Sequence, residues 1–522
     1  MTTTTPSAAP LSTFAIRVDA RDNVAVARVT VPPGTRVECD GTVVEVTDAI
    51  TPGHRFALVP IPAGDFVRQY GQPIGTSRGV AAGALISREN MSNDVPVVRD
   101  LDPALQNPPP DYVDEARRAT FMGYHRPDGR VGIRNWILVV PTSMCASHEA
   151  TQIATVSEYT IFDRERFPNV DGVVAIPHTK GCGCSDGSNI EVMLRTLANY
   201  AAHPNVGGVV FIGLGCEKTN LTVMERYLSD RQRPLNKPVV RIGIQDAGGT
   251  KESVRRGVEA VAAMLPLVNQ ITRTQTPISD LVLGVKCGGS DGFSGLSANP
   301  ALGRAADELV RQGGTVLITE VPEFCGAEHI LASRAKDAET GKAVYEMVDW
   351  YKEYASKFGS VLNENPSPGN VAGGLLNITI KSLGAIAKAG TTRVEGVVGY
   401  SERPEGHGLY LMQGPGYDQE STPGLIAAGA QLVVFTTGRG TTIGNAIAPV
   451  IKLASNTAIF NRMRGDLDLS AGAIVDGTGS IDEVGLEVFE FVRRAASGEV
   501  RACAEENQHR EFQMWAEQAV SL

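Results

Sequence analysis

Three short apolar runs decide the fold: WILVVPT (residues 136–142), GVVAIPHT (172–179) and GGVVFIGLGC (207–216). Each run is rich in β-branched residues and leads directly into a turn that carries Gly, Cys or His. The helical pattern SNIEVMLRTLANYAAH (188–203) lies between the second and third runs. Strand, turn and helix in this order predict a mostly parallel sheet, with functional loops at the C-terminal ends of its strands.

A second unit of the same kind begins near residue 279. The segment LVLGVKCGGSDG (281–292) is a strand followed by a Gly-rich turn, ANPALGRAADELVRQGG (298–314) is helical, and TVLITEVPE (315–323) is the next strand. A later strand, AQLVVFTTGRG (430–440), again ends in a Gly-rich turn. We therefore predict the fold class α/β, with two Rossmann-like α/β lobes of mostly parallel sheets and a site between them.

The N-terminal region has a different pattern. Residues 14–31 alternate apolar and polar positions, and the turn motifs PPGT, CDGT and TPGH follow, which predicts a small β barrel or clip. The acidic, Pro-rich stretch 94–118 predicts an extended linker. The predicted division is a disordered tail (1–13), the small β domain (14–90), the linker (91–120), a first α/β catalytic lobe (121–275) and a second one (276–522).

Composition excludes several classes of function. The formal net charge is −10 and no basic tract is present, which argues against nucleic-acid binding. No apolar run approaches the roughly 18–20 residues that span a bilayer, and the first residues lack the features of a secretory signal. The eight cysteines are too sparse for a disulfide scaffold. We expect a cytoplasmic protein with reduced thiols, and a homo-oligomer, specifically a dimer.

Four strand-end loops carry the reactive side chains. They contain Cys145 in PTSMCAS; His178, Lys180, Cys182, Cys184 and Asp186 in PHTKGCGCSDG; Cys216, Glu217 and Lys218 in GLGCEKTN; and Lys286, Cys287, Ser290, Asp291 and Ser294 in KCGGSDGFSGLSANP. Thiolates and imidazole suit Fe and Zn, and carboxylates favour harder ions. The four strand-end cysteines, Cys145, Cys182, Cys216 and Cys287, are therefore predicted to converge on one metal centre. The alternative is that each is a small buried hydrophobic residue, the reading we give to Cys39, Cys325 and Cys503.

The Gly-rich turns suit carboxylate binding. Backbone N–H groups in GGSDGFSG, ENPSPGN and TTGRGT can bind a carboxylate, and Arg439 in the last of these could bind one with two parallel hydrogen bonds. No GxGxxG with its acidic partner and no GxxxxGK[ST] occurs, which disfavours dinucleotide and P-loop sites. His54 lies in a turn of the small β domain and becomes a candidate only if that domain docks over the α/β site.

Taken in order, these motifs resemble the altronate/galactarate dehydratase family. The resemblance rests on GYHRPDGRVGIRN, PHTKGC, GLGCE, CGGSDGFSGLSANP, ENPSPGN and FTTGRGT, which run from about residue 121 onward. The N-terminal segment, with DNVAV, PPGT and GHRFAL, resembles the SAF (β-clip) domain that this family carries first. The resemblance thus covers nearly the whole chain.

The resemblance implies a hydro-lyase that acts on a sugar acid with a divalent metal, Fe²⁺ before Mn²⁺. A mononuclear ion and an iron–sulfur cluster built on Cys145, Cys182 and Cys287 are both left open. It implies catalytic roles for His178, His54, Arg439 and Lys452, and substrate binding by Ser290, Asp291, Ser294, Asn299, Asn365 and Arg439. It implies metal binding by His54, Cys145, Cys182, Cys216, Glu217 and Cys287. Cys184 and Cys325 depart from the family pattern and are left out of the metal set.

The substrate is less sharply indicated. The segment EVPEFCGAE, with Glu320, Glu323 and Glu328, and the end of the chain resemble the altronate branch more than the galactarate branch. We therefore expect D-altronate to be converted to 2-dehydro-3-deoxy-D-gluconate. The alternatives are galactarate or another aldonate or aldarate, a sulfonated hydroxy acid that loses sulfite, and a sugar-acid-binding protein without catalysis. Lys180 and Lys218 keep the sulfonate alternative open, because a sulfonate needs extra cations.

Overall fold

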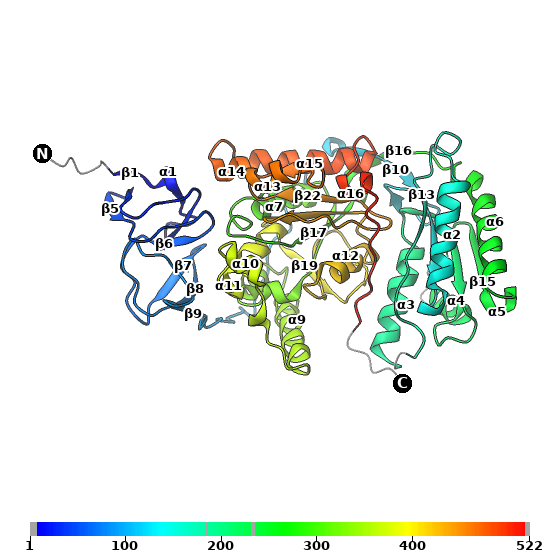
Figure 1. Cartoon of the computed structure of the whole chain (residues 1–522), viewed down its shortest axis with the longest axis horizontal. Coiled ribbons are helices and arrows are strands. Elements are labelled where there is room, and N and C mark those ends of the chain that lie inside the picture. Colours follow the sequence, from blue (N-terminus) through cyan, green and yellow to red (C-terminus); the bar gives the residue numbers. More distant parts are fainter. Residues whose placement is uncertain (1–7, 184–185, 231–234, 517–522) are drawn as a thin grey trace, which may run out of the picture.

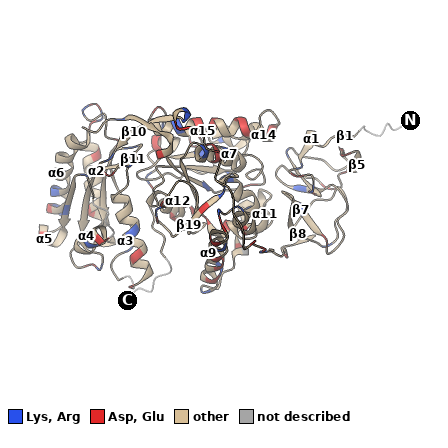
Figure 2. Ribbon diagram, turned by 180° about the vertical axis from the view of Figure 1, so that it is seen from behind, with Lys and Arg blue, Asp and Glu red and all other residues tan. Residues whose placement is uncertain are grey.

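The computed structural model describes residues 8–183, 186–230 and 235–516, arranged in three parts along one long axis (Figure 1). An N-terminal β domain lies at one end, a C-terminal lobe (residues 278–516) in the centre, and a middle lobe (120–277) at the other end. None of the described helices is long and apolar enough to cross a membrane. Lys and Arg are interspersed with Asp and Glu along helices of both lobes (Figure 2).

The N-terminal domain is built from three small sheets. They comprise β1 (Ala9–Pro10), β4 (Arg36–Cys39) and β5 (Thr42–Glu45); β2 (Ala15–Ile16), β3 (Val24–Ala27) and β6 (Arg55–Ala57); and β7 (Phe66–Gln69), β8 (Gln72–Ser77) and β9 (Met91–Ser92). Val26, Val31 and Phe56 are fully buried between them. The side chain of Asp22 accepts hydrogen bonds from the backbone of Tyr70 and Gly71, which ties two of the sheets together.

An extended segment joins this domain to the rest of the chain. Residues 93–114 form no helix or strand apart from one isolated bridge. The segment lies on the C-terminal lobe, where Arg99 forms ion pairs with Glu328 and Asp349. The Asn107 amide donates to the carbonyls of Ser333 and Ala335. The chain therefore crosses the C-terminal lobe before it forms the middle lobe.

The middle lobe contains a four-stranded parallel sheet, as predicted. Its order is β13 (Gly172–Ala175), β12 (Trp136–Pro141), β14 (Val206–Gly213), β15 (Val239–Gly243). Side chains of β12 alternate between two cores, which explains its continuous apolar run. Ile137 and Val139 face α2 (Ser147–Thr160) and α6 (Thr250–Val268), while Leu138 and Val140 face α3 (Ser188–Ala201) and α4 (Leu221–Asp230).

The C-terminal lobe contains a seven-stranded parallel sheet. Its order is β19 (Val394–Val398), β20 (Gly408–Met412), β18 (Thr315–Ile318), β17 (Val282–Cys287), β21 (Leu432–Thr437), β22 (Val450–Ala454), β23 (Leu469–Ser470). Helices α7 (Ala298–Arg311) and α15 (Ile481–Ser497) pack together on one face, and α12 (Asp418–Ala427) lies on the other (Figure 1). Parallel sheets in both lobes confirm the predicted α/β class, and the finer likeness to a Rossmann fold stays a prediction.

Each sheet contains a strand from which the chain continues to both sides. In the middle lobe β12 is followed by β13 on one side and β14 on the other, and in the C-terminal lobe β17 is followed by β18 on one side and β21 on the other. Such switch points leave a crevice at the C-terminal strand ends, where α/β proteins bind ligands. The molecule therefore has two places suited to a site.

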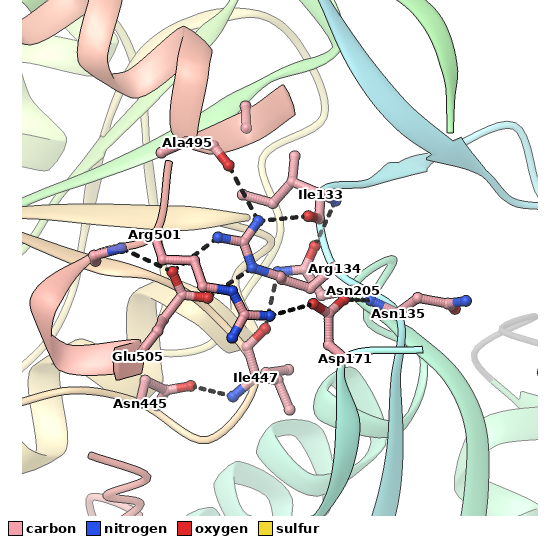
Figure 3. A network of polar contacts seen from close by, with 12 residues as sticks. Ile133, Arg134, Asn135, Asp171, Asn205, Asn445, Ile447, Ala495, Arg501 and Glu505 are labelled. Carbon is pink, nitrogen blue, oxygen red and sulfur yellow. Dashed lines mark hydrogen bonds and ion pairs between the residues drawn. The ribbon is translucent and has the colours of Figure 1, made fainter. Parts of the chain in front are cut away.

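A buried polar network joins the two lobes (Figure 3). Arg134 pairs with Glu505 through two hydrogen bonds of 2.6 and 2.8 Å and also donates to the Ala495 carbonyl. The Asn205 amide donates to the carbonyls of Gln431 and Ile447. A further antiparallel sheet of β10 (Thr120–His125), β11 (Val131–Gly132) and β16 (Thr274–Pro277) lies at this junction. These contacts fix the orientation of the lobes.

Candidate active site and thiol cluster

Three loops meet at the switch point of the C-terminal lobe: residues 288–297 after β17, 438–445 after β21, and 365–374. The Gly289 carbonyl accepts hydrogen bonds from the backbone of Gly438 and Arg439. Gly292 N–H donates to the Gly373 carbonyl at 2.7 Å, and the Asn370 amide donates to the Ser290 carbonyl at 2.7 Å. The predicted substrate-binding motifs therefore lie together.

Asp291 and Ser294 shape the first of these loops. The buried Asp291 carboxylate accepts hydrogen bonds from the backbone and hydroxyl of Ser294, the Ser455 hydroxyl and the Asn456 amide. Burial raises the pKa of Asp291 above its ordinary value, which these hydrogen bonds partly oppose. Its carboxylate is thus engaged within the protein and holds the loop for other groups.

Two predicted residues keep free polar atoms. The Ser290 hydroxyl is buried and has no hydrogen-bond partner in the described part of the chain. The Arg439 side chain is exposed beside Gly369 and makes no ion pair with a described residue. A guanidinium and an orphaned hydroxyl in adjoining loops suit a carboxylate ligand, because Arg binds carboxylates through two parallel N–H groups.

The N-terminal domain docks onto these same loops. Gly53 and Gly292 approach so closely that a Cβ on Gly292 would lie 2.1 Å from the Gly53 carbonyl oxygen. Arg55 donates to the Gly374 carbonyl, and the Asn377 amide donates to the Ile74 carbonyl at 2.7 Å. The docking that a role for His54 requires is therefore present. Nδ1 of His54 lies 2.9 Å from the Thr51 hydroxyl, and burial lowers its pKa.

The remaining predicted residues of this lobe support the loops. Asn299 donates to the Gly384 carbonyl and accepts from the Thr436 hydroxyl. The buried Lys452 ammonium donates to the backbone carbonyls of Ile443 and Val450, and burial lowers its pKa. Asn365 accepts from Lys381 at 2.9 Å. It also borders a cavity of about 370 Å³ that aromatic side chains line: Tyr351, Tyr354, Phe358 and Tyr417.

Cys287 lies in a buried cluster with two glutamates. Among the described residues, Cys287, Glu320 and Glu323 are the one set whose three potential ligand atoms lie within 4.8 Å of one another. Three buried lysines already pair with them. Lys286 lies 2.5 Å from Glu320, Lys381 lies 2.9 Å from Glu323, and Lys388 lies 3.1 Å from both Glu320 and the Cys287 sulfur.

These lysines decide what the cluster can hold. Burial raises the pKa of the Cys287 thiol, which keeps it protonated and donating to Glu323. Although burial opposes it, Lys381 and Lys388 hold the pKa of Glu323 at about 2. A divalent cation here would have to replace ammonium groups that already neutralise the carboxylates. The triad therefore fits a structural ion-pair cluster better than a metal site.

Lys381 and Lys388 were missed from sequence, although a signal exists. Lys381 lies in α11 (Ile378–Ala385), whose every residue is buried, and Lys388 lies in the 3-10 helix η6 (Ile386–Ala389) directly after it. Charged residues in such an apolar stretch are almost always paired when buried. What the sequence does not contain is the identity of the partners, which come from β17 and from residues after β18.

The other three predicted cysteines gather in the middle lobe. Cys145, Cys182 and Cys216 follow β12, β13 and β14, and all three are exposed. The neighbouring Cys145, and after it Cys216 and Glu217, raise the pKa of the Cys182 thiol, so these side chains lie close together. The Gln245 amide donates to the Cys216 sulfur at 3.5 Å. Cys184 lies outside the described residues.

The single predicted metal centre is therefore divided. Cys287 belongs to the seven-stranded sheet and contacts Glu323 and Lys388, whereas Cys145, Cys182 and Cys216 follow strands of the four-stranded sheet. The error has a simple cause, because comparable strand ends in two different sheets have the same local sequence pattern.

His178 and Glu217 brace the thiol loops. Nε2 of His178 lies 2.9 Å from the Pro141 carbonyl, and Nδ1 accepts from Lys180 N–H. Burial lowers the pKa of His178 to about 4. The Glu217 carboxylate accepts from the Thr142 hydroxyl at 2.6 Å and from the backbone of Leu214 and Gly215. Proton transfer by His178 would require the ring to give up one of its two contacts.

Comparison with known proteins assigns all three parts. Residues 278–520 match the D-galactarate/altronate dehydratase C-terminal family model, residues 123–269 the D-galactarate dehydratase/altronate hydrolase second domain, and residues 13–94 the altronate/galactarate dehydratase SAF domain. An altronate dehydratase of Bacillus subtilis is 35% identical over 93% of this chain and 95% of its own length.

Two further relatives carry other names. A galactarate dehydratase (L-threo-forming) of Escherichia coli is 36% identical, with 94% of each chain covered. The beta subunit of a (2R)-sulfolactate sulfo-lyase of Chromohalobacter salexigens is 32% identical over 76% of this chain and 97% of its own length. Identity alone does not choose among three such similar values.

Proposed function

Because the chain belongs to the altronate/galactarate dehydratase family, it is a sugar-acid dehydratase, and we propose that its substrate is D-altronate. The reaction would remove one water molecule and give 2-dehydro-3-deoxy-D-gluconate. The family membership supports the hydro-lyase chemistry, and the charge of the site supports the choice of substrate.

Arg439 carries this choice. The three loops at the switch point (288–297, 365–374 and 438–445) contain no Lys and no Arg other than Arg439. One unpaired guanidinium matches one carboxylate, as an aldonate has. Galactarate has two carboxylates, and a sulfonated hydroxy acid has a carboxylate and a sulfonate, so both would need a second cation. The Arg55 guanidinium of the docked domain already donates to Gln69 and to the Gly374 carbonyl. The glutamates that resemble the altronate branch do not contribute, because Glu320 and Glu323 are paired with buried lysines.

The proposed chemistry follows from this arrangement. Arg439 and the free Ser290 hydroxyl would hold the substrate carboxylate, where negative charge grows as the α-proton leaves. His54 belongs to the docked N-terminal domain, and its lowered pKa keeps its ring neutral at pH 7. We assign it the role of accepting the α-proton of the substrate. Asn365 would bind a distal hydroxyl. Catalytic roles for His178 and Lys452 stay predictions, since both are engaged by backbone groups.

A divalent metal is part of the proposal, with Fe²⁺ preferred and Mn²⁺ as the alternative. The three exposed thiols of the middle lobe fit iron, because thiolates select soft metals while Mn²⁺ prefers oxygen ligands. Bound there, iron would lie in the middle lobe, apart from the C-terminal loops that carry Arg439 and Ser290, so we assign it no contact with the substrate carboxylate. The Glu217 oxygens are engaged by hydrogen bonds, so Glu217 would position the loop and would not ligate.

We also propose a cytoplasmic homodimer. The aromatic cavity beside Asn365 is flanked by exposed apolar side chains, including Phe358 (52% exposed), Val361 (63%) and Tyr417 (56%). Exposed apolar groups that gather in this way mark contact surfaces, and a second copy is the usual partner.

An anaerobic substrate screen tests the proposal. Full-length protein loaded with iron is offered altronate, galactarate and (2R)-sulfolactate, and formation of the 2-keto-3-deoxy acid or sulfite is followed. We expect altronate to have the highest kcat/KM. Arg439→Ala should lower it by roughly 10- to 100-fold, the value of a charged hydrogen bond. Arg464→Ala, which removes an exposed Arg bonded to Asn461, should have no effect. Preferred turnover of galactarate, or an unimpaired Arg439→Ala enzyme, would reject the proposal.

A further inference from the structure

Three thiols flank the switch point of the middle lobe. Cys145 and Cys216 follow the two strands that border it, β12 and β14, and Cys182 follows β13 on the other side of β12. Free cysteines are among the most buried residue types, yet these three are exposed and lie next to one another. Exposed thiols collected from three separate loops indicate a binding function.

Hydrogen bonds from buried side chains connect the loops that carry the thiols. Glu217 joins the loop after β14 to the end of β12 through the Thr142 hydroxyl, and Thr219 donates to the Thr142 carbonyl at 2.7 Å. His178 joins the loop after β13 to Pro141, and Met144 N–H donates to the Lys180 carbonyl at 2.7 Å. A buried carboxylate and a buried imidazole thus hold the three loops in register, which surface thiols without a ligand would not require.

Close backbone contact brings Cys182 to Cys145. Gly181 has φ +108° and packs on Ser143, where a Cβ would lie 2.7 Å from the Ser143 Cβ, so only glycine fits. The Ser143 hydroxyl is fully buried and has no hydrogen-bond partner among the described residues. A buried donor without a partner between two thiol loops is a second indication that a ligand belongs here.

The spacing of the thiols selects the kind of ligand. One tetrahedral ion with metal–sulfur bonds of about 2.3 Å places its sulfurs about 3.8 Å apart. In the described chain only Cys287, Glu320 and Glu323 bring three ligand atoms within 4.8 Å, so the three exposed thiols are spread more widely. An iron–sulfur cluster has its thiolates on different iron atoms and suits a wider set.

We propose that Cys145, Cys182 and Cys216 bind a [4Fe–4S] cluster. Three thiolates leave one iron without a protein thiolate, and Glu217 has no free oxygen to supply. That iron is open to a small oxygen ligand. The middle lobe lies at the opposite end of the molecule from the docked N-terminal domain, so the cluster site is separate from the proposed substrate site at Arg439 and goes beyond the proposed function. The Gln245 amide, which donates to the Cys216 sulfur, would tune the cluster as hydrogen bonds to cluster sulfur do.

Cluster content tests this directly. The full chain is purified without oxygen, reconstituted with Fe²⁺ and sulfide, and analysed for iron, acid-labile sulfide, absorption near 400 nm and the EPR signal of the reduced form. We expect about four iron and four sulfide per chain. Cys145→Ser, Cys182→Ser and Cys216→Ser should each lose most of this content, whereas Cys39→Ser and Cys503→Ser should keep it.

Other outcomes overturn the proposal. One iron without sulfide would show a mononuclear site, and full content in all three thiol variants would show that the cluster lies elsewhere. Circular dichroism of each variant separates cluster loss from unfolding. Activity is measured independently: a cluster-bearing protein without turnover rejects the proposed function alone, and turnover without a cluster rejects the present inference alone.

Discussion

The ring of His178 is held between two backbone groups, the Pro141 carbonyl and the Lys180 N–H. Only the neutral ring can donate to one and accept from the other. Burial lowers the pKa of His178 from 6.5 to about 4, although the hydrogen bond to the Pro141 carbonyl opposes this shift. The Glu217 carboxylate is likewise fixed in one protonation state. Its hydrogen bonds with Thr142, Gly215 and Leu214 hold its pKa below the ordinary value, although burial opposes this. Both residues are ionisable groups used for architecture.

Acid should destabilise the middle lobe through His178. Below pH 6.5 the unfolded chain binds a proton that the folded chain refuses until about pH 4. The contribution of the neutral ring to the free energy of unfolding is therefore complete above pH 6.5. It falls by up to about 3 kcal/mol as the pH drops from 6.5 toward 4. Urea unfolding between pH 7.5 and 4.5 measures this slope.

His178→Gln should flatten that slope, while His407→Gln, at an exposed position, should leave it unchanged. Part of the slope remains in either variant, because complete burial also lowers the pKa of His203. An identical slope in the wild type and His178→Gln would show that the imidazole does not stay neutral in the folded lobe.

At the scale of elements, the buried ion-pair cluster connects β17 with the segments after β18 and with α11. Glu320 supports it in a left-handed conformation (φ 76°) that is rare for residues other than glycine, which places its carboxylate against Lys286 and Lys388. Such a cluster gives little net stability when complete, but its parts depend strongly on one another.

Lys388→Met should therefore be costly. It leaves Glu320 partly unpaired and the Cys287 thiol without its ammonium neighbour, and we expect a loss of about 3–5 kcal/mol in the free energy of unfolding. Lys342→Met breaks an exposed pair with Glu346 and should cost less than about 1 kcal/mol. Equal denaturation midpoints for the two variants would contradict the view that this cluster is held by its charges.

The elements also show how far sequence reasoning reaches. The run at 136–142 predicts β12 because its residues face two cores and must all be apolar, and the motifs of residues 288–297 and 438–441 predict adjoining loops. The partition of Cys287 from Cys145, Cys182 and Cys216 could not be predicted. It depends on β17 pairing with β21, about 150 residues later, and no local pattern encodes that pairing.

For the whole molecule, the important contact is between the SAF domain and the Gly-rich loops of the C-terminal lobe. Glycine at 53, 292 and 374 lets two backbones meet where any side chain would separate them. The middle lobe, which carries the three exposed thiols, lies at the opposite end of the long axis from this contact (Figure 1). The relative position of the parts therefore depends on the docking at one end and the Arg134–Glu505 junction at the other.

Gly292→Ala should undock the SAF domain. The added Cβ would meet the Gly53 carbonyl at 2.1 Å, and backbone atoms cannot move aside cheaply. We expect kcat/KM to fall on the order of 100-fold through misplacement of His54, with faster proteolysis of residues 93–114. Gly465→Ala, where nothing lies within 4 Å, should change neither. Unchanged proteolysis and activity in Gly292→Ala would show that the domain tolerates the shift.

The extended segment of residues 93–114 has a consequence for how the gene can be organised. Residues 93–114 contribute no strand or helix, and the SAF domain is held by its own contacts with Gly374 and Asn377. A gene divided within this segment would therefore encode two polypeptides that can associate without a covalent link. A fused gene ensures that the two parts are made in equal amounts. The sulfo-lyase beta subunit, which matches 76% of this chain, is of a size consistent with such a break. Fission and fusion at this one place would exchange the domain that docks on the Gly-rich loops and leave the middle lobe with its three thiols unchanged.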